Sequence, residues 1–291
     1  MNKPKISVLM GVYNGSKHVQ SAMLSILAQD YQEFEFIIIN DGSTDDSLRK
    51  IKAINDPRIV IIDQKNQGLT KSLNHALSIA KGEYIARQDA DDISLSSRFT
   101  KQIREFEKTP ELGMLGSSMY ISNSKGTFNE IFHYPCQHHE LKKAVFSFNP
   151  FIHGAMMIKK DILLQAGGYN EDYTYVQDYE LWSRLIFTTT SANLPEPLYA
   201  RLREDDCSET SVDKSSYVNA IQKSLQAKES ENNEIAKQEI KAQSIYPYLG
   251  LPILYCKPLS RTYRNIAQLA KHHQLLTNYQ KLALKYFPWG S

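Results

Sequence analysis

The chain has 291 residues, of which 42% are hydrophobic and 23% are charged, and its formal net charge at pH 7 is +2. This composition is that of a globular protein with one large or two small domains, and it gives no sign of a nucleic-acid partner. The three cysteines are few, odd in number and far apart, so we expect no disulfide framework and a reducing, cytoplasmic environment.

The first part of the chain alternates between strand and helix signals. Four apolar runs are typical of strands that are covered on both sides: residues 5–12, 34–39, 58–62 and 83–88. Three intervening segments repeat apolar residues at helical spacing: 19–27, 48–54 and 69–80. Ser43 with Asp46 is a helix N-cap signal before the second of them. This alternation predicts an α/β fold with a Rossmann-like, mostly parallel sheet and helices on both faces.

The rest of the chain has an α+β pattern. We expect strands at 112–121, 151–159 and 194–202, and helices at 94–108, 160–166 and 178–187. From residue 215 on, amphipathic helices are expected. We therefore divide the chain into one domain over 1–214, with halves at 1–110 and 111–214, and a C-terminal helical extension over 215–291.

The extension differs from the rest of the chain in charge. From residue 214 on there are 11 Lys and Arg residues against four Glu, and no acid follows Glu239. Basic residues interleaved with aromatic ones suit an anionic membrane surface, whereas the many leucines suit packing in a homo-oligomer. Residues 244–256, which are nearly uncharged, are too short to span a bilayer. We expect a cytoplasmic protein, peripheral at most to the inner face of the membrane, that makes membrane or homo-oligomer contacts through 215–291.

Three carboxylates follow the predicted strand at 83–88: Asp89, Asp91 and Asp92. Acids this close together repel one another, and a divalent cation with oxygen ligands relieves the repulsion. Because such a cation also takes phosphate oxygens, the cluster predicts a metal–diphosphate site at the carboxyl end of a strand. The alternative for an isolated D-x-D is a solvated acidic turn that caps the next helix.

Two other polar turns follow predicted strands, at residues 13–14 and 41–43. Open parallel sheets bind ligands outside the carboxyl ends of their strands, so the three turns are expected on one edge. The first turn is not G-x-G-x-x-G, and the chain has no G-x-x-x-x-G-K-[ST]. An NAD-type dinucleotide site and a P-loop NTPase are therefore both disfavoured.

The order and spacing of these segments resemble family 2 glycosyltransferases with the GT-A fold. The matching segments are 7–15 (SVLMGVYNG), 39–47 (INDGSTDDS), 66–68 (NQG), 73–76 (LNHA), 82–92 (GEYIARQDADD), 167–169 (GGY) and 177–181 (QDYEL). The resemblance covers residues 4–205. It implies a nucleotide-binding half over 1–110, an acceptor half over 111–214, and inverting transfer of one sugar. The expected donor is a nucleotide sugar, UDP-linked by preference, and the expected acceptor is a glycan, lipid-linked or protein-linked.

The resemblance also implies roles for individual residues. Asp178 corresponds to the catalytic base, and Asp91 with Asp89 to the ligands of a Mn²⁺ or Mg²⁺ ion. The implied donor-nucleotide contacts are Val12, Tyr13, Asn14, Asp41, Asn66, Gly68, Lys71, Asp89 and Ala90. The candidate acceptor or diphosphate contacts are His153, Gln177, Trp182, Arg201 and Arg203.

The chain departs from the family pattern at two places. Gln177 replaces the acid that precedes the base in relatives. Arg201 and Arg203 stand where many relatives carry a metal-binding His, and a guanidinium there could pair with the diphosphate instead. From position alone, Asp178 is better explained as a helix cap, and His153 is at least equally well explained as a core histidine.

Two other functions remain open at this level. A nucleotidyltransferase that makes the sugar nucleotide would share the sheet and the acidic site, but would usually carry a Gly-rich loop with Arg or Lys after the first strand. A non-catalytic partner in polysaccharide assembly would keep the fold while losing acids that this chain retains.

Overall fold

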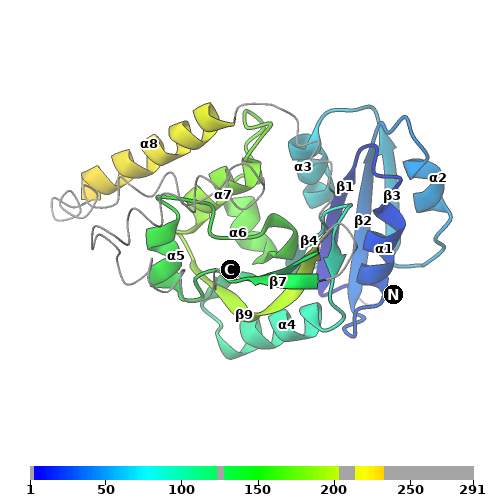
Figure 1. Ribbon diagram of the computed structural model, residues 1–291, viewed down its shortest axis with the longest axis horizontal. Helices are drawn as coiled ribbons and strands as arrows, with labels where there is room; N and C mark the ends of the chain where they lie inside the picture. The colour runs from blue at the N-terminus through cyan, green and yellow to red at the C-terminus, as the bar shows by residue number, and fades with distance from the viewer. Residues whose placement is uncertain (1–2, 123–127, 203–213, 233–291) are drawn as a thin grey trace, which may run out of the picture. The chain divides into compact units, whose positions relative to one another are not determined.

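The computed structural model describes residues 3–122, 128–202 and 214–232 (Figure 1). All of them belong to one unit, Met1–Asn233. Its framework is a single mixed sheet in which the described strands follow the order β3-β2-β1-β4-β8-β6-β9-β5, with β7 paired to β6.

The first four strands form the predicted parallel part of the sheet. They are β1 (Ile6–Val12), β2 (Phe34–Asp41), β3 (Ile59–Gln64) and β4 (Tyr84–Arg87). The helices that connect them are α1 (Val19–Leu27), α2 (Ser47–Lys52) and α3 (Leu69–Ile79). The pairs β1–β2, β1–β4 and β2–β3 are all parallel. The carboxyl ends of the four strands therefore meet at one edge, as predicted.

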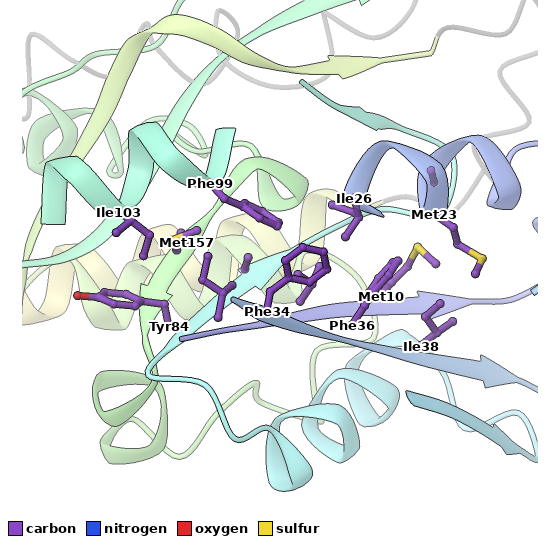
Figure 2. Packing of buried hydrophobic residues seen from close by; sticks show 14 of the residues in the cluster. Met10, Met23, Ile26, Phe34, Phe36, Ile38, Tyr84, Phe99, Ile103 and Met157 are labelled. Carbon is purple, nitrogen blue, oxygen red and sulfur yellow. The ribbon is translucent and has the colours of Figure 1, made fainter. Parts of the chain in front are cut away.

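Helices cover both faces of this parallel part. Figure 2 shows one face, where Met10, Phe36 and Ile38 of the strands pack beneath residues of α1 and α4 (Arg98–Lys108): Met23, Ile26, Phe99 and Ile103. On the other face α3 packs so closely on β1 that a Cβ at Gly11 would lie 2.8 Å from Leu69 Cδ1. Burial on both faces explains why β1, β2 and β4 are continuously apolar rather than alternating.

The second part of the sheet has mixed strand directions. Its strands are β5 (Ile93–Ser94), β6 (Leu112–Ser122), β7 (Phe128–Phe132), β8 (Met157–Lys159) and β9 (Thr190–Arg201). The remaining helices of this part are α5 (His138–Ala144), the 3-10 helix η1 (His153–Ala155), α6 (Lys160–Gln165) and α7 (Gln177–Leu185). β8 is antiparallel to both β4 and β6, whereas β6 and β9 are parallel.

The predicted strand at 151–159 was too long. The chain forms the 3-10 turn η1 before β8. In this turn Gly154 lies against the side chain of Tyr199 in β9, a contact that only a residue without a Cβ can make. A Cβ on Gly154 would lie 2.0 Å from the Tyr199 hydroxyl oxygen. Such close approach depends on a residue 45 positions away, so no local pattern signals it.

Two helix starts were also misplaced. The predicted helix 94–108 begins only at Arg98, because Ser94 is paired in a short ladder with Tyr199 of β9. The predicted cap at Ser43 and Asp46 makes no side-chain cap hydrogen bond, and α2 begins at Ser47. Asp45 accepts the N–H of Ser47 at 2.9 Å in its place. The short helix α5 was not predicted.

The last described helix, α8 (Ser215–Asn232), packs against α7. Ile221 and Leu225 are buried, and Gln222 Nε2 donates to the carbonyl oxygen of Ser147 at 3.2 Å. No helix within the described part of the chain is long and apolar enough to cross a membrane. Residues 233–291, on which the membrane-contact and homo-oligomer predictions mainly depend, lie outside the described residues.

Candidate active site

The acidic loop after β4 contains an ion pair with β4 itself. Arg87 is 3% exposed, and its Nη2 donates to Asp89 Oδ1 at 2.6 Å. Burial alone would raise the pKa of Asp89, but the Arg87 guanidinium, with Arg201 nearby, lowers it. Asp89 is therefore held ionised and in a fixed orientation.

The other two acids of the loop have raised pKa values. The Asp91 side chain is exposed at the rim, and desolvation within the site followed by repulsion from Asp89 raises its pKa. Asp92 is buried, and its Oδ1 accepts the backbone N–H of Leu202 at 3.2 Å. Burial, followed by the charges of Asp91 and Asp89, raises the pKa of Asp92 well above its ordinary value. Burial and mutual repulsion thus both disfavour the ionised forms of Asp91 and Asp92.

The oxygens of this loop fit a divalent cation that is shared with a ligand. Across residues 3–122, 128–202 and 214–232, no three His, Cys, Asp or Glu side chains are grouped to enclose a metal ion. A cation on a diphosphate needs only one or two carboxylates, because phosphate oxygens and water complete its shell. Asp91 and the Oδ2 atom of Asp89 meet that requirement, whereas Asp92 is buried against Leu202.

The turns after β1, β2 and β4 meet at one edge, as predicted. Asn14, in the left-handed conformation with φ 49°, accepts the Thr44 N–H at 2.8 Å, and its own N–H donates to Ser43 Oγ at 3.0 Å. A Cβ on Gly15 would lie 3.7 Å from the Cβ of Ala90. The first turn therefore touches both the second turn and the acidic loop.

Asp41 is bonded entirely within the protein in this structure. It is 3% exposed, and its Oδ1 accepts hydrogen bonds from Gln64 Nε2 at 2.8 Å and from the Gln67 N–H at 2.9 Å. Its Oδ2 accepts the Gly68 N–H at 2.8 Å. The carboxylate fixes the loop before α3, in which Gly68 has φ +90°. Its contact with the donor nucleoside stays a prediction.

The other predicted donor contacts differ in exposure. Four side chains at this edge are exposed: Tyr13, Asn14, Asn66 and Lys71. Gly68 and Ala90 are half-buried, and Val12 is buried under the first turn. The exposed side chains are accessible to a ligand, whereas Val12 contributes to the core beneath them.

Asp178 lies in the first turn of α7, within electrostatic range of Asp89. The helix begins at Gln177 with Val176 at its N-cap, so Asp178 is not the N-cap residue. Asn149 Nδ2 donates to Asp178 Oδ2 at 2.7 Å. Burial raises the pKa of Asp178 and the charge of Asp89 adds to the rise, while the Tyr179 N–H and the Asn149 amide partly oppose it. Gln177 is buried beside it.

His153 and Trp182 belong to an aromatic cluster beneath the site. His153 Nε2 shares a 2.8 Å hydrogen bond with the Tyr169 hydroxyl, and the His153 and Trp182 rings are 6.0 Å apart. Burial, with the positive charge of Arg87, lowers the pKa of His153 to about 3, so its imidazole is neutral. Trp182 is fully buried, and its Nε1 has no hydrogen-bond partner within the described residues.

Of the two predicted arginine contacts, Arg201 is the last residue of β9 and belongs to the described part of the chain. Arg201 is close enough to the acidic loop to lower the pKa of Asp89 and to oppose the rise at Asp91 and Asp92. This placement fits the predicted diphosphate contact. Arg203 lies outside the described residues.

Sequence reasoning missed several residues that support the site. Arg98, fully buried, donates to the carbonyl oxygens of Arg87 and Met156, each at 3.0 Å, and so ties the end of β4 to η1. Tyr199 accepts the Asp89 N–H at 3.2 Å. Neither contact has a local signal. The Arg87–Asp89 pair has one, because residues two apart on an extended chain project to the same side.

Comparison with known proteins identifies the family. The model of glycosyl transferase family 2 matches residues 7–166. The chain belongs to this family. An uncharacterized glycosyltransferase of Haemophilus influenzae is 34% identical over 209 residues, covering 68% of this chain and 65% of that protein. The O-antigen biosynthesis glycosyltransferase WbnJ of Escherichia coli is 30% identical over 257 residues, covering 87% of this chain and 96% of that protein.

A solved structure confirms the fold of this family 2 glycosyltransferase. Residues 1–349 of Staphylococcus aureus TarS, in complex with UDP-GlcNAc, superpose with a TM-score of 0.62 at 19% identity, over 76% of this chain and 65% of that chain. At this level of identity the likeness concerns the fold, and it bears out the predicted GT-A architecture. The chain spans about two thirds of the length of the TarS 1–349 chain and of the Haemophilus protein.

Proposed function

We propose that the protein transfers one sugar, with inversion, from a nucleoside-diphosphate sugar to a glycan, lipid-linked or protein-linked acceptor. The observation that carries the proposal is the pairing of an oriented carboxylate, Asp178, with the acidic loop at 89–92 at one edge of the sheet. UDP-sugars are the first donors to test, because TarS has been solved with UDP-GlcNAc. The name of WbnJ supports a role in bacterial polysaccharide assembly.

In the proposed reaction Asp178 accepts the proton of the acceptor hydroxyl as its oxygen attacks the anomeric carbon. The bond to the diphosphate breaks on the opposite face of the sugar, so the configuration inverts. A Mn²⁺ or Mg²⁺ ion bound at Asp91 and Asp89 would stabilise the negative charge of the departing diphosphate. Arg201 adds positive charge on the same side, and neutral His153 takes no proton near pH 7.

The test is release of UDP from UDP-GlcNAc, UDP-glucose and UDP-galactose by the full chain with Mn²⁺, with water as acceptor. Asp91→Ala is expected to lose nearly all release. Asp178→Asn is expected to lose roughly 10²-fold in turnover, the usual scale for a general base, while the thermal shift given by the donor persists. Asp161→Asn, an exposed acid of α6, is the matched control and should behave as wild type.

Two results would contradict the proposal. Full activity of Asp91→Ala in chelator would remove the metal site from the reaction. Formation of pyrophosphate from UTP and a sugar 1-phosphate would identify a nucleotidyltransferase instead.

A further inference from the structure

Asn149 is a buried amide whose two ends are both engaged. Its Nδ2 donates to Asp178 Oδ2 at 2.7 Å, and its Oδ1 accepts the Phe151 N–H at 3.2 Å. The second bond fixes the amide orientation, because only the oxygen can accept from an N–H. The nitrogen must therefore face the carboxylate.

The segment that carries Asn149 is itself anchored to β9. Asn193, a buried residue of β9, donates through Nδ2 to the carbonyl oxygens of Pro150 at 3.1 Å and Pro135 at 2.9 Å. Pro150 also restricts the backbone directly after Asn149. A rigid support of this kind is what a group must have if it is to hold another side chain in one rotamer.

The amide is also chemically suited to this position. A neutral donor stabilises an ionised carboxylate without a full positive charge, which would depress its basicity much further. An amide neither gives nor takes a proton near pH 7, so it leaves proton transfer to the carboxylate. Asn149 holds Oδ2 of Asp178, and the N–H of Tyr179 also bonds to this carboxylate, so its orientation is fixed from two sides.

We propose that Asn149 is the positioning residue of Asp178: it fixes the carboxylate rotamer and keeps the carboxylate ionised for proton abstraction. This inference rests on the proposed function, in which Asp178 is the base. The other groups that face Asp178 are the Asp89 carboxylate, the Tyr169 hydroxyl and the N–H of Tyr179. Asp89 and burial both oppose ionisation of Asp178, so the amide acts against them.

The test compares Asn149→Ala and Asn149→Asp in the full chain. The second variant keeps the shape and the oxygen that accepts the Phe151 N–H, but it replaces the amide donor by an acid. In the pH profile of kcat/KM for UDP release from UDP-GlcNAc, we expect the acid limb to move up by about one pH unit for Asn149→Ala and further for Asn149→Asp. If Asn149 only supports the fold, the acid limb should move less for Asn149→Asp than for Asn149→Ala, because Asn149→Asp keeps the shape of the side chain.

The control is Asn40→Ala. Asn40 is a buried amide that donates to Asp63 Oδ1 at 2.7 Å, the same kind and length of bond, at the carboxyl end of β2 beside Asp41. It should lose comparable stability without moving the acid limb. An unmoved limb in both Asn149 variants, or an equal movement in Asn40→Ala, overturns the inference.

A second measurement separates this inference from the proposed function. The pKa of Asp178 is followed by carboxyl ¹³C NMR in the full chain, with Asp178→Asn used to assign the signal. A rise of that pKa in the Asn149 variants supports the coupling even if wild type releases no UDP, in which case the proposed function alone fails. An unchanged pKa overturns the inference whatever the activity.

Discussion

The carboxylate of Asp41 offers a sharp test of how much one buried hydrogen-bonding group contributes to this fold. In Asp41→Asn the isosteric amide can keep an oxygen towards Gln64 and Gln67, but it then turns its NH₂ group towards the Gly68 N–H. One charge-assisted hydrogen bond worth about 2 kcal/mol is lost, and two others weaken by about 0.5 kcal/mol each as the charge disappears. Relief from burying a charge offsets part of this. We expect the free energy of unfolding to fall by about 2–3 kcal/mol.

The assay is urea unfolding of the full chain, followed by tryptophan fluorescence. Asp45→Asn is the matched control, because Asp45 also accepts several hydrogen bonds, among them those from Ser16 N–H, Ser47 N–H and Ser47 Oγ, but is exposed. Water replaces lost bonds at an exposed group, so the control should lose less than half as much. A loss in Asp41→Asn that does not exceed the control would refute the reasoning. Unchanged stability with lost UDP binding would assign Asp41 to the nucleoside instead.

Two further predictions concern the interior of the site. Gly154→Ala places a methyl group 2.0 Å from the Tyr199 hydroxyl oxygen and 2.7 Å from Asp89 Oδ2. It should lower the free energy of unfolding by about 3 kcal/mol in urea, as overpacking does; a loss below about 1 kcal/mol would show that Tyr199 moves freely. Asp178→Asn should raise the melting temperature at neutral pH. The folded state raises the pKa of Asp178, so folding favours the protonated carboxyl. The protonated carboxyl costs the folded state nothing at acid pH, but the free energy of unfolding falls as pH rises through the raised pKa and Asp178 ionises. The asparagine variant does not ionise and so escapes this loss. The melting difference should therefore shrink towards pH 4, and a difference independent of pH would contradict this.

The parallel half of the fold was predictable because its determinants are local. Each strand is apolar along both faces and each helix repeats its apolar residues, so one sequence window specifies each element. The second half was less predictable. The turn at Gly154 and the late start of α4 both depend on Tyr199, which reaches them only after the chain has closed on itself.

The candidate site shows the same division. The sequence predicts three acids that need a cation, and all three lie in the loop after β4. The Arg87–Asp89 pair has a local signal that the sequence reasoning missed. No local signal indicates that Asp92 accepts the backbone N–H of Leu202, 110 residues later. The amide of Asn149 was also missed, because nothing in the segment around it indicates that its partner lies 29 residues on.

The segment that precedes α7 is anchored to α3 through its backbone. Asn74 of α3 pairs with both backbone polar atoms of Tyr169, accepting its N–H at 2.9 Å and donating to its carbonyl oxygen at 2.9 Å. Thr70 of the same helix donates to the carbonyl oxygen of Tyr173 at 2.9 Å. These anchors recognise the backbone, whereas the side chains of the segment make other contacts: Glu171 accepts from Asn74 Nδ2 at 3.1 Å, and Tyr173 and Tyr175 lie against Tyr217. We therefore expect exchanged versions of residues 170–175 to dock on α3 when they keep the acid at position 171 and the aromatic residues at positions 173 and 175.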